Sequence, residues 1–388
     1  MADAETIWIN GEFVAWEDAK VHVLTHALHY GTGVFEGIRA YETPRGTAVF
    51  RHGDHIERLF KSAELYYMEI PYSREELRTA THELIARNGL KSCYIRPLVF
   101  RGASPMGLYS LDCPVEVAIA VWEWGAYLGD EGKQRGVRGK VSSWRRIGPD
   151  ALIPAAKATG QYLNSVLAKI EADKAGYEEG ILLDQRGMVC EGTGENLFVV
   201  KDGRIATPGF SSSILGGINR LSAIEIARDL GYEVQERDIA RGELYMADEI
   251  FMTGTAAELT PLREIDDHPV GSGQPGEVTR EVQNEFEDAL HGRSERYAHW
   301  LDVVPAPAGH AEGAHVGLQP LVLEPREQLG LLRVGGREAG LDERDPEVVE
   351  DVRHPDLLVH RQRHPLPLHP VAQGGVVDGD AGHGAGAA

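Results

Sequence analysis

The spacing of apolar positions predicts alternating β-strands and helices through roughly the first 300 residues. Strands are expected where β-branched and aromatic residues alternate with polar ones between turn residues. Asn10-Gly11 separates two such runs and is the dipeptide most typical of a tight hairpin. The predicted strands are Thr6–Ile9, Glu12–Val14, Gly33–Tyr41, Thr47–Arg51, Tyr94–Phe100, Val115–Trp122, Gly180–Asp184, Met188–Glu191, Asn196–Val200 and Glu249–Thr253.

Helices are expected where apolar residues recur three and four positions apart. Ser73-Arg74-Glu75-Glu76 is a capping-box pattern, which typically begins a helix. Leu163, Val166, Leu167 and Ile170 recur at this spacing and predict an amphipathic helix. The predicted helices run from a cap at Asp54 to about Met68, and over Glu75–Asn88, Gln161–Ala175 and Asn219–Leu230.

The order of these elements divides the chain into four parts. Residues 1–124 are predicted to form a small N-terminal α/β domain, and residues 125–131 a crossover between domains. Residues 132–303 are predicted to form a larger domain with many loops at strand ends, and residues 304–388 a low-complexity tail. The expected fold class is therefore α+β, with two folded domains and a disordered or frameshifted tail.

The tail has an unusual composition. From Leu301 to Ala388 only ten residue types occur, and Ile, Phe, Tyr, Trp, Met, Cys, Lys, Ser, Thr and Asn are absent. Codons beginning with G or C encode the ten types present, as expected when a GC-rich gene is read in the wrong frame. We therefore expect the native end near Val303 or Val304, and one intact frame on resequencing would instead support a natural disordered tail. Such a segment buries too little surface to offset about 1–2 kcal/mol of backbone entropy per residue.

Composition and charge narrow the class of protein. Hydrophobic content of 42% and a net charge of −21 indicate a globular protein without a polyanionic partner such as nucleic acid. Cys93, Cys113 and Cys190 have no CxxC spacing, which fits a reducing cytosol. The start lacks a signal-peptide pattern, and no run is long enough to span a membrane. A cytoplasmic protein is expected, and since the tail histidines lack a ligand spacing, no metal site is predicted.

The candidate chemistry centres on Lys157, which lies among small residues in the stretch 153–164. A lone lysine is usually a solvated surface residue, but small neighbours leave room for a bulky group to reach its amine. A Ser/Gly-rich loop, residues 211–217, precedes a predicted helix, whose free N–H groups favour a phosphate. Glu191 follows an apolar strand, and Arg58 lies on an apolar helix face as a candidate phosphate clamp. Together, a lysine, a phosphate cradle and an acid suggest pyridoxal phosphate.

A set of motifs in a fixed order closely resembles the branched-chain amino-acid aminotransferases, which belong to the fold-type IV pyridoxal-phosphate enzymes. The resemblance covers roughly residues 5–303, and the tail has no counterpart in it. It implies a small N-terminal domain and a larger pseudo-barrel domain that binds the cofactor. The motifs are His26-Ala27-Leu28-His29-Tyr30-Gly31, Val34-Phe35-Glu36-Gly37-Ile38-Arg39-Ala40-Tyr41, Tyr94-Ile95-Arg96-Pro97, Ile153-Pro154-Ala155-Ala156-Lys157, Glu191-Gly192-Thr193-Gly194-Glu195-Asn196-Leu197-Phe198 and Gly254-Thr255-Ala256-Ala257-Glu258.

The resemblance implies roles for the cofactor residues. Lys157 would hold pyridoxal 5'-phosphate as a Schiff base and then act as the catalytic base and acid. Glu191 would pair with the pyridine nitrogen, and Tyr162 would bind the phenolic oxygen. Asn219 stands where most relatives have a hydroxyl residue and Gly216 where they have a proline, so altered affinity for the cofactor is expected. The remaining cofactor-binding residues are implied to be Arg58, Asn196, Leu215, Gly217, Ile218, Asn219 and Thr255.

The resemblance also implies the substrates, which are L-leucine, L-isoleucine or L-valine and 2-oxoglutarate, with glutamate as a product. An apolar pocket would hold the branched side chain by desolvation, and Arg96 with Tyr30 would receive the distal carboxylate of glutamate. Tyr94 and the Thr255-Ala256 turn would take the α-carboxylate. The implied substrate-binding residues are Tyr30, Phe35, Gly37, Arg39, Tyr94, Arg96, Trp124, Tyr127, Thr255 and Ala256.

The sequence leaves other functions possible. A D-amino-acid aminotransferase or an aminodeoxychorismate lyase has the same fold, but Gly194-Glu195-Asn196 and the pair of Tyr94 and Arg96 favour the branched-chain type. A catalytically dead binding protein is a further alternative. The family resemblance implies a homo-oligomer, either a dimer or a hexamer, with Tyr30 and the loop 102–108 reaching into the neighbouring subunit's site.

Overall fold

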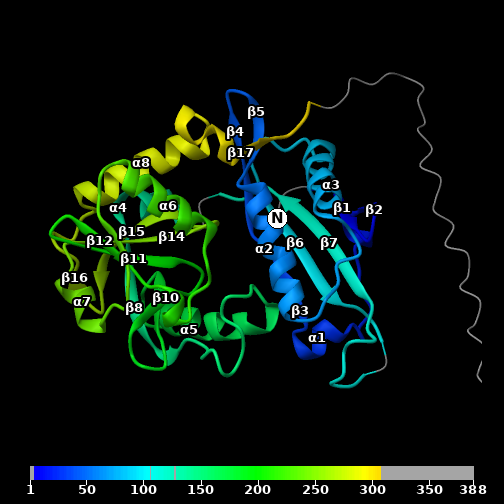
Figure 1. Cartoon of the computed structure of the whole chain (residues 1–388), viewed down its shortest axis with the longest axis horizontal. Helices are drawn as coiled ribbons and strands as arrows, with labels where there is room; N and C mark the ends of the chain where they lie inside the picture. Colours follow the sequence, from blue (N-terminus) through cyan, green and yellow to red (C-terminus); the bar gives the residue numbers. More distant parts are fainter. Residues whose placement is uncertain (1–3, 105, 126–127, 307–388) are drawn as a thin grey trace, which may run out of the picture. The chain divides into compact units, whose positions relative to one another are not determined.

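The computed structural model describes residues 4–306 of the 388-residue chain, except residues 105, 126 and 127 (Figure 1). Residues 307–388, which are most of the tail predicted for residues 304–388, and Tyr127 lie outside the described residues, so what was predicted for them stays a prediction. None of the helices among the described residues combines the length and the apolar character needed to cross a membrane.

The first sheet has eight strands among the described residues, and most of them come from the first third of the chain. Its order is β17-β5-β4-β6-β7-β1-β2, with β3 paired to β6. Helices α2 and α3 pack against it (Figure 1). The elements are β1 Thr6–Ile9, β2 Glu12–Ala15, α1 His26–Tyr30, β3 Gly33–Phe35, β4 Ile38–Thr43, β5 Gly46–Phe50, α2 His52–Leu65, α3 Arg74–Arg87, β6 Cys93–Arg101, β7 Val115–Trp122 and β17 Leu301–Val303.

The second sheet has nine strands among the described residues, with the order β10-β9-β8-β15-β14-β11-β12-β13 and β16 paired to β15. Helices α6 and α8 pack together, and both contact β14. The elements are α4 Gly129–Arg135, β8 Val137–Arg145, α5 Tyr162–Lys174, β9 Glu179–Leu183, β10 Val189–Gly192, β11 Asn196–Lys201, β12 Arg204–Thr207, α6 Ile218–Asp229, β13 Val234–Glu236, α7 Arg241–Met246, β14 Glu249–Gly254, β15 Glu258–Ile265, β16 His268–Pro269 and α8 Glu277–Leu290. Short 3₁₀ turns occupy Trp16–Asp18, Thr159–Gln161, Phe210–Ser212 and Glu295–Trp300.

Three clusters of buried apolar side chains form the core. One lies under the first sheet, with Ile38 and Leu59 fully buried, and a second lies within the other sheet around Leu197 and Met252. The third joins Phe50 of the first sheet to α6 and α8. The chain therefore buries apolar surface between the elements of both sheets as well as within each. The predicted division at residues 125–131 stays a prediction.

Several local predictions are confirmed. Asn10 and Gly11 both have positive φ in the β1–β2 turn, and Ser73 forms a complete capping box with Glu76 at the start of α3. Asp54 does not cap α2 as predicted. The helix begins three residues earlier, because its N-cap is Arg51, which has a φ of 48°, and Asp54 lies in its first turn.

The predicted strand Gly33–Tyr41 is wrong in one respect, because it is divided into β3 and β4 at Glu36-Gly37. Glu36 is fully buried, and its carboxylate bonds to Arg58 and His55 on α2. A second difference concerns α5, where Leu163, Val166, Leu167 and Ile170 are all exposed rather than buried. The helical period was predicted, but this face points away from the chain's own core.

Candidate active site

Lys157 lies on the loop between β8 and α5, and backbone contacts fix its position. Its N–H donates to the Ser62 hydroxyl of α2 over 3.1 Å, and its carbonyl accepts from the N–H of Phe35 in β3 over 3.0 Å. The neighbouring Ala156 and Ala158 are buried, so small side chains let this loop pack closely. These bonds anchor the loop to α2 and β3. The lysine side chain points into a cavity.

The amine of Lys157 donates to the hydroxyl of Tyr162 over 2.6 Å. Tyr162 is the first residue of α5, and its ring packs edge-on against Phe35 at 4.8 Å. The amine also lies 4.9 Å from the centre of the Phe35 ring. Within the described part of the chain no carboxylate forms an ion pair with Lys157, so its nitrogen is not committed to a structural salt bridge.

Glu191 on β10 is a buried carboxylate that three groups hold in place. Arg146 pairs with it at 2.9 Å, and it accepts hydrogen bonds from the N–H of Leu215 at 2.9 Å and from the Asn196 amide at 3.1 Å. Burial raises the pKa of Glu191, whereas Arg146 and the Leu215 N–H oppose that rise. A carboxylate held this firmly is suited to pair with a cationic group of a ligand.

The N-terminus of α6 forms a second polar region beside Glu191. Gly217 is its N-cap, with no side-chain cap, and a Cβ atom there would lie 1.9 Å from Oδ1 of the Asn196 side chain. Asn219 donates to the Gly254 carbonyl over 3.0 Å, while its own buried Oδ1 has no hydrogen-bond partner among the described residues. Uncapped N–H groups at the start of a twelve-residue helix favour an anion.

Arg58 reaches this region from α2 and is held by Glu36. Its Nε and Nη2 donate to Glu36 over 2.6 and 2.8 Å, and its Nη1 donates to the Gly216 carbonyl over 2.8 Å. His55 Nδ1 lies 2.8 Å from the same carboxylate. Burial alone would raise the pKa of Glu36, but Arg58 and His55 outweigh it and hold this pKa far below its ordinary value. The guanidinium is thereby positioned at the α6 N-terminus.

Replacing Glu36 by Gln is expected to weaken the fold at neutral pH and to reduce its sensitivity to acid. The charged carboxylate pairs with a buried guanidinium, and breaking such a pair typically costs about 3–5 kcal/mol. Since the folded pKa of Glu36 is depressed, its contribution is present above the unfolded pKa and is lost as the pH falls below it. Urea unfolding at pH 7, 5 and 3 measures this, and equal acid sensitivity in both proteins would contradict it.

Lys157 lines a cavity of ≈310 Å³ between the first sheet and α5. Aromatic rings form one wall, where Tyr94 packs on Trp124 at 4.5 Å and Arg96 lies 4.9 Å over the Phe35 ring. Residues predicted for the site that line the cavity are Phe35, Gly37, Tyr94, Arg96, Trp124, Lys157, Tyr162, Thr255 and Ala256. Polar and apolar groups therefore meet at one lysine.

Two predicted substrate residues do not line this cavity. Arg39 pairs with Glu258 at 3.0 Å and donates to the Trp124 carbonyl, so its guanidinium is engaged beside the cavity. Tyr30 on α1 is exposed and packs on His26 at 4.6 Å. Tyr127 lies outside the described residues.

Other residues of the site were not predicted from the sequence. The cavity is also lined by Ser165, Val166, Lys169 and Ile170 of α5, and by Thr193, Gly194 and Glu195. The α5 residues follow Tyr162 at helical spacing, three, four, seven and eight positions on, and this signal was available. Arg146 and Glu36, which position Glu191 and Arg58, had no comparable signal.

Gly37→Ala is expected to raise the KM for the amino-acid substrates that the sequence resemblance implies by roughly tenfold, because small misplacements at a site are costly. A Cβ atom at Gly37 would lie 2.1 Å from the Tyr94 hydroxyl, so this side chain must move. Gly194 lines the same cavity, and a Cβ there meets nothing within 4 Å, which makes Gly194→Ala the matched control. Steady-state kinetics of both variants decide, and similar KM values in the two would contradict the prediction.

Comparison with known proteins places these features in a family. A family model for class IV amino-transferases matches residues 33–265. The chain belongs to this family. The class IV aminotransferases act on amino acids and 2-oxo acids, so the chain is an enzyme of that kind.

Relatives of this class IV aminotransferase include the branched-chain-amino-acid aminotransferase of Escherichia coli (strain K12), which is 50% identical over 306 residues. These residues are 78% of this chain and 98% of the relative. The solved structure of the Escherichia coli enzyme superposes with a TM-score of 0.77 and covers 78% of this chain and 100% of that chain.

Two solved structures of the T.th. branched-chain amino acid aminotransferase are also similar. One contains pyridoxamine 5'-phosphate, with 51% identity and a TM-score of 0.76, and the other contains N-(5'-phosphopyridoxyl)-L-glutamate, with 50% identity and a TM-score of 0.75. Each covers 79% of this chain and 100% of the solved chain. The resemblance to branched-chain aminotransferases and the fold-type IV architecture, both predicted from the sequence, are confirmed.

Proposed function

We propose that this aminotransferase moves the amino group of L-leucine, L-isoleucine or L-valine to 2-oxoglutarate, giving glutamate and a branched 2-oxo acid. The observation that carries the proposal is the single cavity in which the Lys157 amine lies among aromatic and aliphatic walls, with Arg96 as a cation beside them. The names of the similar enzymes support it, as does the glutamate adduct in one of the two T.th. structures.

The proposed cofactor is pyridoxal 5'-phosphate, and the residues present fit it. Lys157 would hold it covalently, Tyr162 would bind its phenolic oxygen, and Glu191 would pair with its ring nitrogen. Bound there, it would supply an electron-accepting ring that stabilises negative charge at the substrate's α carbon. Its phosphate would be held by Arg58, Leu215, Gly217, Ile218, Asn219 and Thr255. Asn196 would act through Glu191, because its amide bonds to that carboxylate.

Lys157 would also move protons. Its Nζ, freed when substrate displaces it, would take the proton from the substrate's α carbon and give it up to the cofactor in the same half-reaction. It would carry a proton in the opposite direction when the 2-oxo acid is aminated. Tyr162 Oη lies 2.6 Å from this nitrogen, so the hydroxyl keeps the amine directed into the cavity between steps. Thr159 hydrogen-bonds to the Gly31 and Gly33 carbonyls and fixes the loop after Lys157.

Substrate side chains would bind along the aromatic wall. Phe35, Trp124, Val166 and Ile170 offer apolar surface, which favours a branched side chain at about 25 cal/mol per Å² buried. Tyr94 and the turn at residues 255–256 would bind the α-carboxylate. Arg96, with its Nη2 3.5 Å from the Tyr94 hydroxyl, would receive the distal carboxylate of glutamate.

A steady-state assay with L-leucine, D-alanine and aminodeoxychorismate tests the proposal. We expect transfer from L-leucine to 2-oxoglutarate to be fastest, and the absorption of the yellow holoenzyme to shift when glutamate is added. Preference for D-alanine or aminodeoxychorismate would favour the other enzymes of this fold. A colourless protein that binds leucine without turnover would favour a catalytically dead binding protein.

We further propose that the active protein is a homo-oligomer in the cytoplasm. All three cysteines are free and buried, which suits a reducing compartment. The exposed apolar face of α5 borders the cavity through Val166 and Ile170, and Tyr30 on α1 is exposed as well. A second copy covering this face would close the cavity on the side that the chain itself leaves open.

Leu163→Glu is expected to lower the mass of the assembly and its activity together. Leu163 is 70% exposed on α5, and a charge buried in an apolar interface without a partner is costly. Met246, which is 69% exposed at the end of α7, provides the matched control as Met246→Glu. Sedimentation analysis with activity measurements decides, and an unchanged mass for Leu163→Glu would exclude α5 from the interface.

A further inference from the structure

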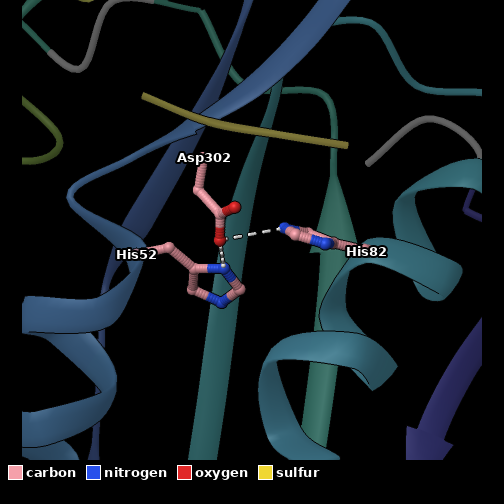
Figure 2. Close-up of side chains that lie close together, drawn as sticks. All are labelled: His52, His82 and Asp302. Atoms are coloured by element: carbon pink, nitrogen blue, oxygen red, sulfur yellow. Dashed lines mark hydrogen bonds and ion pairs between the residues drawn. The ribbon is translucent and has the colours of Figure 1, made fainter. Parts of the chain in front are cut away.

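Three side chains far apart in the sequence point toward one another between α2, α3 and β17, as Figure 2 shows. His52 Nδ1 lies 2.9 Å from Asp302 Oδ2, and His82 Nε2 lies 3.2 Å from the same oxygen. One ligand atom from each residue falls within 4.8 Å of the other two. We call these residues, His52, His82 and Asp302, the His-His-Asp cluster.

The cluster is largely shielded from solvent but is not closed. The His52 side chain is fully buried, whereas the side chains of His82 and Asp302 are 15% and 23% exposed. A cavity of ≈540 Å³, lined by His52, Asp302 and His299 among others, adjoins it. Solvent or a small ion can therefore reach the ligand atoms from this side.

The simplest account of the cluster is a hydrogen-bonded clamp. Arg78 Nη2 also donates to Asp302 Oδ2 over 2.9 Å, so one carboxylate oxygen faces three nitrogen groups. The hydrogen bonding in this clamp is incomplete, however. His52 Nε2 is buried without a hydrogen bond, the contact of buried His82 Nε2 with Asp302 lacks hydrogen-bond geometry, and Asp302 Oδ1 accepts no hydrogen bond from the described residues. The ligand atoms that lie together are His52 Nδ1, His82 Nε2 and Asp302 Oδ2, and two imidazole nitrogens with a carboxylate oxygen are donors that a transition-metal ion accepts.

We propose that the His-His-Asp cluster binds one divalent transition-metal ion of the zinc type. Tetrahedral zinc with bonds of about 2.0–2.1 Å holds its ligand atoms roughly 3.3 Å apart. The two separations to Asp302 Oδ2, 2.9 and 3.2 Å, lie close to that value. The third pair, the two imidazole nitrogens, lies within 4.8 Å and would have to reach it on binding. A water molecule from the adjoining cavity would supply the fourth ligand, and Arg78 would remain bonded to the ligating carboxylate.

Imidazole nitrogens select the metal. They suit zinc and its neighbours in the first transition series, whereas magnesium prefers oxygen ligands only. The ion would join β17 to α2 and α3, and His52 and Asp302 are 250 positions apart in the sequence. No motif spacing in the sequence reveals such a site, because its ligands come from three separate elements. Its role would be structural, since the residues of the proposed active site are not among its ligands.

Zinc titration of the chelator-treated full chain, followed by calorimetry, tests the proposal. The chain has 16 histidines, of which 14 lie outside the cluster, so the variants carry the argument. His82→Gln and Asp302→Asn should each lose one zinc equivalent or weaken its binding at least about 100-fold, more than loss of an outer-shell partner does. His299 lines the same cavity without being a ligand, so His299→Gln is the control and should bind zinc as the parent does.

The thermal midpoint gives a second measurement. Zinc at about 100 times its Kd should favour the folded parent by about 100-fold, raising the midpoint, and should raise it less in His82→Gln. Circular dichroism checks that the variants fold. Equal zinc binding by the parent and by both His82→Gln and Asp302→Asn would overturn the proposal and leave the hydrogen-bonded clamp. Equal binding of magnesium would overturn it too, because that result indicates general attraction to an acidic chain.

Discussion

Replacing Lys157 by alanine is expected to abolish turnover while leaving the fold intact. The backbone bonds that hold this loop, to Ser62 and Phe35, do not involve the amine, so they survive the change. The lost group is the proposed covalent link and the proposed proton carrier, and proton transfer alone contributes about 10²–10⁴-fold in rate. We therefore expect kcat to fall by at least about 10⁴-fold, measured with L-leucine and 2-oxoglutarate, together with an unchanged circular dichroism spectrum.

A second lysine in the same cavity sharpens this experiment. Lys169 lies on α5 and also lines the cavity, but it pairs with Glu179 at 3.3 Å. Borohydride reduction of the holoenzyme followed by peptide mapping should place the cofactor on Lys157 and not on Lys169. The label should disappear in Lys157→Ala and remain in Lys169→Ala. Full activity in Lys157→Ala, or a label on another lysine, would end the assignment.

Features fixed by neighbouring residues were predictable, and those fixed by distant ones were not. The Asn10-Gly11 turn and the Ser73 capping box depend on a few adjacent residues, and both are present. The break between β3 and β4 depends on Glu36 turning toward Arg58 and His55, which follow it by about twenty positions on another element. A pattern of strand residues contains no information about such a contact.

The same distinction holds for the site. The motif around Lys157 predicted that this lysine belongs to the site. Residues at helical spacing after Tyr162 line the same cavity from α5. Periodicity also found the apolar residues of that helix but not their direction, because an outward face and an inward face have the same period. The pairing of β17 with β5 brings Asp302 beside two histidines more than 200 positions earlier, and only the folded chain shows this.

Two buried carboxyls, Glu191 on β10 and Glu195 in the turn between β10 and β11, allow the electrostatic part of the proposed mechanism to be tested separately. Glu191 pairs with Arg146, whereas Glu195, four residues later, lines the cavity without an arginine partner among the described residues. Burial, together with the charge of Glu179, raises the pKa of Glu195 to about 8, so this side chain is mostly protonated at pH 7. Glutamine therefore mimics the state of Glu195 at neutral pH but not an ionised Glu191.

Glu191→Gln is expected to lower kcat by about 10²–10³-fold, the usual loss when one preorganised electrostatic contact is removed. The neutral amide cannot balance a protonated ring nitrogen, and it leaves buried Arg146 unpaired, which typically costs about 3–5 kcal/mol of stability. Rates are therefore expressed per mole of bound cofactor, and urea unfolding is measured alongside. Glu195→Gln should change kcat by less than about tenfold, because it removes almost no charge at pH 7. Equal losses in the two variants would mean that Glu191 has no special electrostatic role, since a disturbance of the shared loop alone would then account for both.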